Sequence, residues 1–335
     1  MTARNPALDW LRAAAILMVL ATHFANQFAG GTELAKALSV GGRGVDLFFV
    51  LSGFLLGSQL FRESNATGTV DVRRFWIRRW LRTLPAYYAV LFATFFQLAA
   101  TGKANLIDWR YLIFLQNYLE HRPFLGVTWS LCVEEHFYLA IGPAILLAAR
   151  YPKSAWCFAA IVLALVGLHI AGHYRHRPDY HITETHVLFE QCLAGVLLAW
   201  LAVNRPTTWG RMKRFAGPLF GVSLVLISIA AVNRTVWDWW LPDWGTGGWA
   251  LVFAAWVVGA ESITVRRVAI LEFIASRAYA LYLVHIEALV LARKLPLPPI
   301  GQLVAALAMS LIFAEILHRI VERPFNRLRN RWKPH

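Results

Sequence analysis

The chain has 335 residues, of which 58% are hydrophobic and 16% are charged, and its net charge is +14. A soluble domain of this length would carry more charge, so the apolar excess must face something other than water. Several runs of about 18 or more mostly apolar residues are typical of membrane-spanning helices. We therefore predict one integral-membrane domain over residues 1–335, with no second, soluble domain.

The apolar runs predict an all-α bundle of about ten transmembrane helices. With the N-terminus in the cytoplasm, most Lys and Arg residues fall in cytoplasmic segments, as the positive-inside rule requires, and both termini are cytoplasmic. Because the basic residues are spread over separate loops, nucleic-acid binding is excluded. The predicted spans are 8–29, 44–61, 84–101, 131–149, 154–172, 187–203, 216–232, 248–263, 278–294 and 300–320.

The first predicted span contains Arg12 and His23. An arginine inside the apolar run argues against a cleaved signal peptide, so we expect the span to be retained. The two residues are eleven positions apart, which on a helix is about three full turns, so both lie on one face and are separated by roughly 16 Å of rise. Ionisable residues within a span are costly, and by default they indicate function.

His23 suits the role of a general base. Burial disfavours the charged imidazolium, so the ring is neutral and can accept a proton from a hydroxyl that attacks an acyl carbonyl. It could also carry the acyl group itself. The alternative is a buried histidine satisfied by a neighbouring carbonyl group. Because Arg12 lies on the same helix face, we favour a functional role for His23.

The second span opens on Asp46, in GVDLFFVLSGF, where the carboxylate would pair with an arginine or orient His23. In the loop after it, residues 71–82 place Arg74, Arg78 and Arg82 on one helical face. This pattern predicts an interfacial helix attracted to anionic lipid headgroups. Pro85 is then expected in the first turn of the next span.

Residues 109–119 are apolar but too short to cross a bilayer comfortably. A crossing here would move every later loop to the other side and invert the charge bias. We therefore predict a re-entrant or outer-surface segment that is buried in protein.

Two outer loops are rich in side chains that could hold a polar ligand. Residues 169–186 include five histidines with Asp179 and Glu184, but no pair has a recognised ligand spacing, so we predict no metal site. Residues 233–245 place four tryptophans around Asp238 and Asp243, either as an interfacial belt or as a stacking platform for a sugar. The three cysteines fall in predicted spans and are expected to pack rather than form disulfides; they are Cys132, Cys157 and Cys192.

Further polar residues lie in the later spans. Ser130 and Glu134 are one turn apart on the same face, and His285 lies in the ninth span. Glu322 stands beside a basic tail, where an ordinary ion pair is expected.

Taken together, these segments resemble the acyltransferase family 3 of membrane proteins, whose members transfer acyl groups to carbohydrates and other acceptors. The resemblance runs in order from residue 8 to residue 325. The matching segments are LDWLRAAAILMVLATHF, GRGVDLFFVLSGFLLG, RRWLRTLPAYY, TWSLCVEEHFYL, YALYLVHIEAL and VERPF. The resemblance implies a ten-span bundle with cytoplasmic termini, in agreement with the charge distribution.

The resemblance also implies roles for individual residues. Arg12 and His23 correspond to a catalytic pair, and Arg79 and Arg82, with Arg78 beside them, to arginines that handle the acyl-CoA donor. Guanidinium groups suit this role because they bind phosphates as bidentate forks. Supporting residues would be Asp46, Ser130, Glu134, His285 and Glu322. Since the chain ends at His335, it resembles members without a C-terminal hydrolase-like domain.

We therefore expect an O-acyltransferase of the bacterial cytoplasmic (inner) membrane, in contact with membrane lipids and without a bound cofactor. It would move an acyl group, most simply acetyl, from cytosolic acyl-CoA to a hydroxyl of an extracytoplasmic carbohydrate. One alternative is a secondary transporter or flippase that uses the intramembrane charges, although the sequence has no internal repeat. Another alternative is a lipid-binding or assembly subunit, but this function would not explain why Arg12 and His23 lie inside a membrane span.

Overall fold

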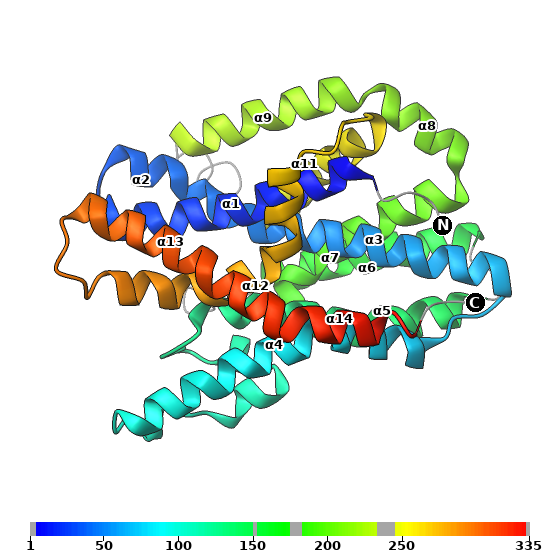
Figure 1. Ribbon diagram of the computed structural model, residues 1–335. Helices are drawn as coiled ribbons and strands as arrows, with labels where there is room; N and C mark the ends of the chain where they lie inside the picture. Colours follow the sequence, from blue (N-terminus) through cyan, green and yellow to red (C-terminus); the bar gives the residue numbers. More distant parts are fainter. Residues whose placement is uncertain (1–4, 150–152, 175–182, 233–244, 333–335) are drawn as a thin grey trace. The chain divides into compact units, whose positions relative to one another are not determined.

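The computed structural model describes residues 5–149, 153–174, 183–232 and 245–332, and every regular element in these ranges is a helix (Figure 1). The predicted all-α membrane class is confirmed. Within the described ranges, seven helical segments are long and apolar enough to cross a membrane. They are Pro6–Phe28 (α1), Glu33–Thr67 (α2, η1 and α3), Val72–Ala100 (α4), Gly126–Ala148 (η5 and α5), Thr185–Asn204 (α7), Ala269–Ala292 (α12) and Pro299–Arg329 (α13, η6 and α14).

The other three predicted spans also lie in helices. A bend of 58° joins α8 (Pro206–Arg214) to α9 (Ala216–Val232), and the pair counts as an eighth span if it crosses as one. Among the described residues, α6 (Ala155–Tyr174) and α11 (Gly245–Ser262) contribute only shorter apolar stretches. The count of ten spans and the cytoplasmic placement of both termini remain predictions.

The chain divides into two compact parts. The first part comprises residues 1–70 and 140–276, and the second part comprises residues 71–139 and 277–335. Two of the three boundaries between the parts fall within α5 (Trp129–Ala148) and α12, and the third lies between the end of α3 at Thr67 and the start of α4 at Val72.

The core of the first part is the pair formed by α3 (Gly44–Thr67) and α7, which run side by side (Figure 1). The backbones touch at two glycines. A Cβ atom at Gly53 would lie 1.9 Å from the Cys192 carbonyl oxygen, and one at Gly195 would lie 2.1 Å from the Val50 carbonyl oxygen. Small residues at such crossings are how membrane helices approach closely without a hydrophobic driving force between them.

The N-terminal helix belongs to the same part. α1 begins after Asn5, whose side-chain oxygen accepts from the Ala7 N–H (3.0 Å) while its amide donates to Glu261 of α11 (3.1 Å). At the other end of α1, Thr22 donates to the Leu38 carbonyl (2.7 Å), which fixes α2 (Glu33–Leu38) and the 3-10 turn η1 (Ser39–Arg43) against it.

In the second part, α4 runs without a break from Val72 to Ala100, with Pro85 inside it. The expectation of a separate interfacial helix, followed by a new span from residue 84 with Pro85 in its first turn, is therefore wrong. Proline has no N–H group, so the Leu81 carbonyl one turn earlier loses its helical partner. Two hydrogen bonds support the backbone on either side of it: Thr83 donates to the Arg79 carbonyl (3.2 Å), and Tyr279 donates to the Thr83 carbonyl (2.9 Å).

Residues 101–125 do not form a span. They contain the short 3-10 turns η2 (Ala104–Leu106), η3 (Trp109–Ile113) and η4 (Gln116–Tyr118), as expected for a non-crossing segment, and η5 (Gly126–Thr128) begins the next span. The expected burial in protein is only partial, because Tyr111 is buried while 61% of Trp109 and 53% of Ile113 is exposed. The segment is anchored by Tyr87 of α4, which donates to the Tyr111 carbonyl (2.7 Å) and accepts from Gln116 (3.0 Å). Burial raises the pKa of Tyr111, so its hydroxyl stays a neutral donor to the Phe124 carbonyl (2.8 Å).

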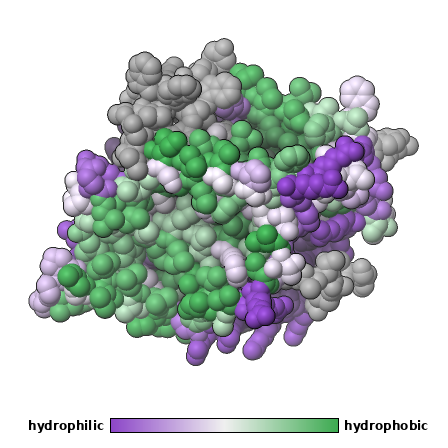
Figure 2. Space-filling view, turned by 90° about the horizontal axis from the view of Figure 1, so that it is seen from above, coloured by the Kyte–Doolittle hydropathy of each residue, from purple (hydrophilic) through white to green (hydrophobic). Residues whose placement is uncertain are grey.

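Large apolar side chains cover much of the surface, as Figure 2 shows for one face. Trp156, Leu163, Val222 and Ile300 are examples, with 84%, 70%, 59% and 77% of their surfaces exposed. Contact with lipid would explain this exposure. The three cysteines are free thiols buried in α5, α6 and α7, which confirms their expected packing role.

The α3–α7 crossing generates a stability prediction. Gly53→Ala and Gly195→Ala would each force the two backbones apart, at a cost of about 1–3 kcal/mol or more. Thermal unfolding in detergent measures this loss. Gly221→Ala in α9 is the matched control, because a Cβ atom there meets nothing within 4 Å and alanine favours the helix. Equal melting temperatures for the three variants would contradict the close packing.

Candidate functional site

Arg12 and His23 both lie on α1, which is uninterrupted between them. The Arg12 Nη1 atom donates to the Asp9 carboxylate at 2.5 Å, and only 15% and 8% of the two side chains is exposed. Sequence analysis missed Asp9, although its three-residue spacing from Arg12 was a usable signal. The contact orients the guanidinium group of Arg12 within an apolar helix.

His23 is half-buried and follows the buried Thr22, at the end of α1 that packs against η1. A Cβ atom at Gly41 of η1 would lie 2.7 Å from the Thr22 Oγ1 atom, while the start of α3 packs about two turns earlier on α1, where a Cβ atom at Gly44 would lie 2.4 Å from the Ala15 carbonyl oxygen. The candidate base is thus on a helix whose surroundings are tightly packed within the first part.

Asp46 lies beside an arginine, the first of its two expected partners. Its carboxylate is 3.6 Å from the Arg43 guanidinium, which also lies over the Trp249 ring at 5.5 Å. The carboxylate is buried, with 4% of Asp46 exposed. Arg43 therefore offsets a buried charge at the start of α3.

The histidine-rich loop is partly described. His169 is hydrogen-bonded to the buried Glu190 of α7 (3.1 Å), and His186 lies 3.1 Å from Glu184. Among the described residues, no group of three or more His, Cys, Asp or Glu side chains could hold a metal ion. The rest of the loop, from His176 to His181, the side chain of His173 and the tryptophan-rich residues 233–244 lie outside the described residues.

The predicted donor-binding arginines lie on α4 of the second part. Arg79 is buried, with 8% exposed, and its guanidinium lies 5.9 Å from the Phe75 ring centroid. Its charged neighbours include Arg82, which is exposed, and Arg78. At least one arginine of α4 is therefore buried within the protein, whereas an interfacial helix would direct its charged face toward lipid headgroups.

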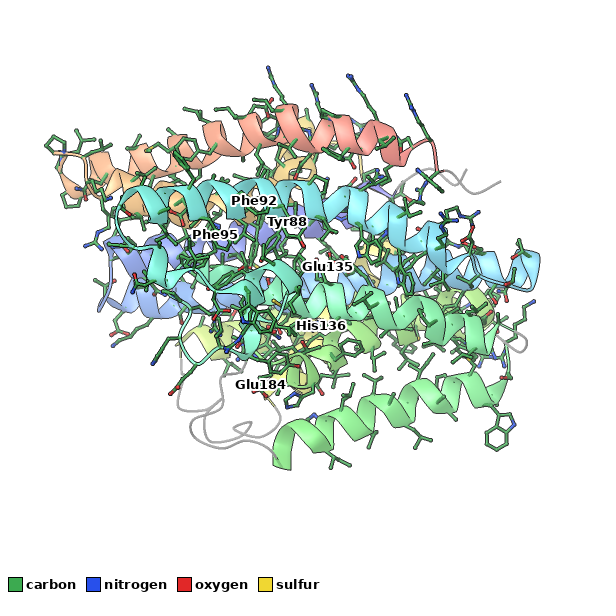
Figure 3. The ribbon with its side chains drawn as sticks, turned by 90° about the horizontal axis from the view of Figure 1, so that it is seen from below. Tyr88, Phe92, Phe95, Glu135, His136 and Glu184 are labelled. Carbon is green, nitrogen blue, oxygen red and sulfur yellow. The ribbon has the colours of Figure 1, made fainter. Side chains whose placement is uncertain are left out.

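Two carboxylates on α5 lie within electrostatic range of Arg79. Glu134 accepts from the Tyr138 hydroxyl (3.1 Å), and the buried Glu135 (Figure 3) accepts from Thr83 (2.7 Å). Ser130 and Glu134 do not share a partner, since Ser130 is hydrogen-bonded to Tyr282 at 2.7 Å. The contact from Thr83 was not expected from the sequence.

His285 is fully buried on α12. Its Nδ1 atom is 2.8 Å from the Tyr282 carbonyl oxygen and 3.1 Å from that of Leu281. Because carbonyl groups only accept, Nδ1 carries the proton, and in the neutral ring Nε2 is the acceptor.

Within the described part of the chain, Glu322 pairs with His318 and not with an arginine of the basic tail, which was the alternative to a functional role. Its hydrogen-bond partner is His318, one turn earlier, at 2.5 Å, and both side chains are buried. The two residues close the π-helical turn η6 (His318–Glu322), which leads into the short helix α14 (Arg323–Arg329). A π turn widens the helix locally, and such turns occur often at functional sites.

The predicted site residues thus form two groups. Arg12, His23 and Asp46 belong to the first part. The residues of the second part are Arg78, Arg79, Arg82, Ser130, Glu134, His285 and Glu322.

Comparison with known proteins identifies related chains. Residues 5–319 match the sequence profile of a family described as an acyltransferase domain, of the acyltransferase 3 type. OatA of Listeria monocytogenes, named a peptidoglycan O-acetyltransferase, is 27% identical over 96% of this chain and 56% of its own length. A Staphylococcus aureus (strain COL) protein, provisionally named an O-acetyltransferase, is 28% identical over 96% of this chain and 57% of its own.

A third relative, YrhL of Bacillus subtilis, is provisionally named a peptidoglycan O-acetyltransferase and is 27% identical over 95% of this chain and 54% of its own length. The chain thus spans a little over half the length of these relatives. No solved structure matches the chain significantly.

The Asp9–Arg12 pair generates a double-mutant prediction. Arg12→Ala or Asp9→Ala alone removes one partner of a buried ion pair, and each is expected to destabilise the protein by about 3–5 kcal/mol. The double variant should lose less than the sum of the two, by about 1–3 kcal/mol. Thermal unfolding of all four proteins in detergent measures the coupling.

The control is the Glu33–Lys36 pair of α2, which has the same spacing but 88% and 56% exposed side chains. No measurable coupling is expected for an exposed pair. Additive losses at Asp9 and Arg12 would show that their contact contributes nothing to stability.

Proposed function

We propose an O-acyltransferase activity from one premise: this chain belongs to the acyltransferase 3 family, whose profile matches residues 5–319. The main observation behind the proposal is that Arg12 and His23 lie on one uninterrupted helix, in the segment that resembles the family's first span. Arg12 is also paired with Asp9 on that helix. Ionisable residues inside a membrane-spanning helix are energetically costly, so an ion pair and a histidine on the same helix indicate a functional role.

The acyl donor that we propose is a cytosolic acyl-CoA, with acetyl as the acyl group. Arg79 and Arg82, with Arg78 beside them, would bind its phosphates. Arg79 has Arg82 and Arg78 among its charged neighbours, and a group of guanidinium side chains matches the charge and the geometry of a phosphate group. Guanidinium groups stay charged under all physiological conditions, so such a site would not depend on local protonation.

The acceptor that we propose is a hydroxyl of an extracytoplasmic carbohydrate. Two of the relatives are named for O-acetylation of peptidoglycan, a carbohydrate polymer. We propose the bacterial cytoplasmic membrane as the location, because there a cytosolic donor and an external glycan can reach the same protein from opposite sides.

In the proposed reaction, His23 removes the proton of the acceptor hydroxyl as its oxygen attacks the thioester carbonyl. The carbon–sulfur bond then breaks, the new ester forms, and the CoA thiolate receives the proton. His23 is thereby returned to its neutral form for the next cycle. Asp9 fixes the orientation of Arg12, so its other N–H groups point in a defined direction toward an anionic group of the donor or the transition state.

A direct test follows the acetyl group. Membranes that contain the protein are given acetyl-CoA labelled in the acetyl group, and labelled glycan is measured. His23→Ala should lower the rate at least about 100-fold, since the general base is lost. His121→Ala, at an exposed loop histidine, is the control and should keep the wild-type rate.

Full activity of His23→Ala at equal protein levels would remove the proposed base. Transport of an intact glycan without any acetylation would instead support the transporter alternative.

A further inference from the structure

The short helix α8 of the first part is a separate element between two apolar helices. Arg205 leaves the helical conformation between α7 and α8, and a bend of 58° separates α8 from α9 (Figure 1). The last turn of α8 contains three basic residues, Arg211, Lys213 and Arg214. A short basic helix next to an apolar one is typical of a segment at a membrane surface.

One face of α8 is fixed against the protein. Trp209 is buried, and its ring stacks on that of Phe54 of α3 with 5.9 Å between the centroids. Just before α8, Arg205 donates to the Lys153 carbonyl (2.9 Å), and its guanidinium lies over the Trp200 ring at 5.0 Å. These contacts define which residues of α8 point outward.

The arginines of α8 lie on the face opposite the buried tryptophan. At about 100° per residue, Arg211 and Arg214 are about 200° and 140° around the helix from Trp209. Both are exposed, and the lysine between them is half-buried. The chain has no acidic residue between Glu190 and Asp238, so no carboxylate one turn away can pair with these cations. Among the described residues, none of the three basic side chains forms an ion pair.

An exposed apolar surface begins directly after the cations. Phe215 follows Arg214 and is exposed, as are Leu219 and Val222 of α9. The three apolar residues are four and three positions apart, so they form one stripe along the helix. Such a stripe on a membrane helix contacts lipid chains. The cations at its end are therefore at the level of the headgroup phosphates.

The end of α11 brings a further cation to this level. Trp256 of α11 donates to Ser223 of α9 (2.8 Å), and a Cβ atom at Gly259 would lie 3.9 Å from the Phe220 ring. Residue numbers thus rise along α11 as they fall along α9, so the two helices are antiparallel. The chain after α11 is directed toward the end of α9 that joins α8, and it contains the exposed Arg266.

We propose that α8 is an interfacial helix that binds anionic phospholipid headgroups through Arg211 and Arg214, with Phe215 among the acyl chains. In the predicted topology this end of the first part faces the cytoplasm, where anionic lipids give the membrane surface a negative potential. The apolar stripe beside the cations favours a lipid, which offers a phosphate and a hydrocarbon chain together. The inference does not depend on the acyl-transfer reaction.

The test uses the full chain in nanodiscs of equal parts phosphatidylglycerol and phosphatidylcholine. A trace of one lipid or the other carries a photoreactive group, and mass spectrometry maps the crosslinked peptides. In the wild-type chain, residues 205–222 should capture more phosphatidylglycerol than phosphatidylcholine. Arg211→Gln together with Arg214→Gln should lower that ratio at least about fivefold, since one basic residue near an anionic surface contributes roughly that factor.

Two further variants separate lipid binding by α8 from a general effect of charge. Lys36→Gln together with Lys103→Gln removes two exposed cations from other segments and should leave the ratio at 205–222 unchanged. Arg211→Lys together with Arg214→Lys keeps both charges and should keep most of the preference. Equal melting temperatures in phosphatidylcholine alone check that the variants are folded.

The inference is overturned if residues 205–222 of the wild-type chain capture both lipids equally or capture neither. It is also overturned if the paired glutamine substitutions in α8 leave the ratio unchanged, or if the Lys36 and Lys103 substitutions lower it as much. Loss of the preference in the paired lysine variant would show that it does not depend on the charge of α8, which overturns the inference as well.

Discussion

The cost of burying charge in an apolar helical bundle constrains the surroundings of the buried ionisable side chains that the structure describes. An uncompensated ion in a low-dielectric interior is strongly unfavourable, so it must be paired or hydrogen-bonded. Asp9 and Arg12 meet this requirement within one helical turn, and His318 and Glu322 do so in the same way. These contacts allow an otherwise apolar chain to keep reactive groups inside its helices.

Arg79 is different, because its neighbours include more arginines. The α4 helix nevertheless places it on the buried stripe with Phe75 and Thr83, at the four-residue spacing of one helical face. The long apolar stem of arginine can be buried while its head remains near polar groups, and the Phe75 ring lies close to that head. The carboxylates of Glu134 and Glu135 on α5 lie within electrostatic range of Arg79, so its charge is offset by groups of the same part of the chain.

Periodic and compositional features were predictable from the sequence. Local sequence patterns alone predict the helical class and the positions of the apolar segments. They also predict that Arg12 and His23 share one helix face, because that depends only on their spacing. The boundary at Pro85 failed because packing can override a local helix breaker: Thr83 and Tyr279 engage carbonyl groups near the proline. The partners of Ser130 and Arg78 lie more than 150 residues away along the chain, so no spacing rule could find them.

The same distinction separates the two groups of predicted site residues, one in each compact part of the chain. The His23 group depends on one helix, so its geometry follows from the eleven-residue spacing and would persist in any bundle that keeps α1 intact. The donor group depends on contacts between α4, α5 and α14, which only tertiary packing creates. Substitutions in α14 would therefore alter the surroundings of the α4 arginines and leave intact the helix that carries His23.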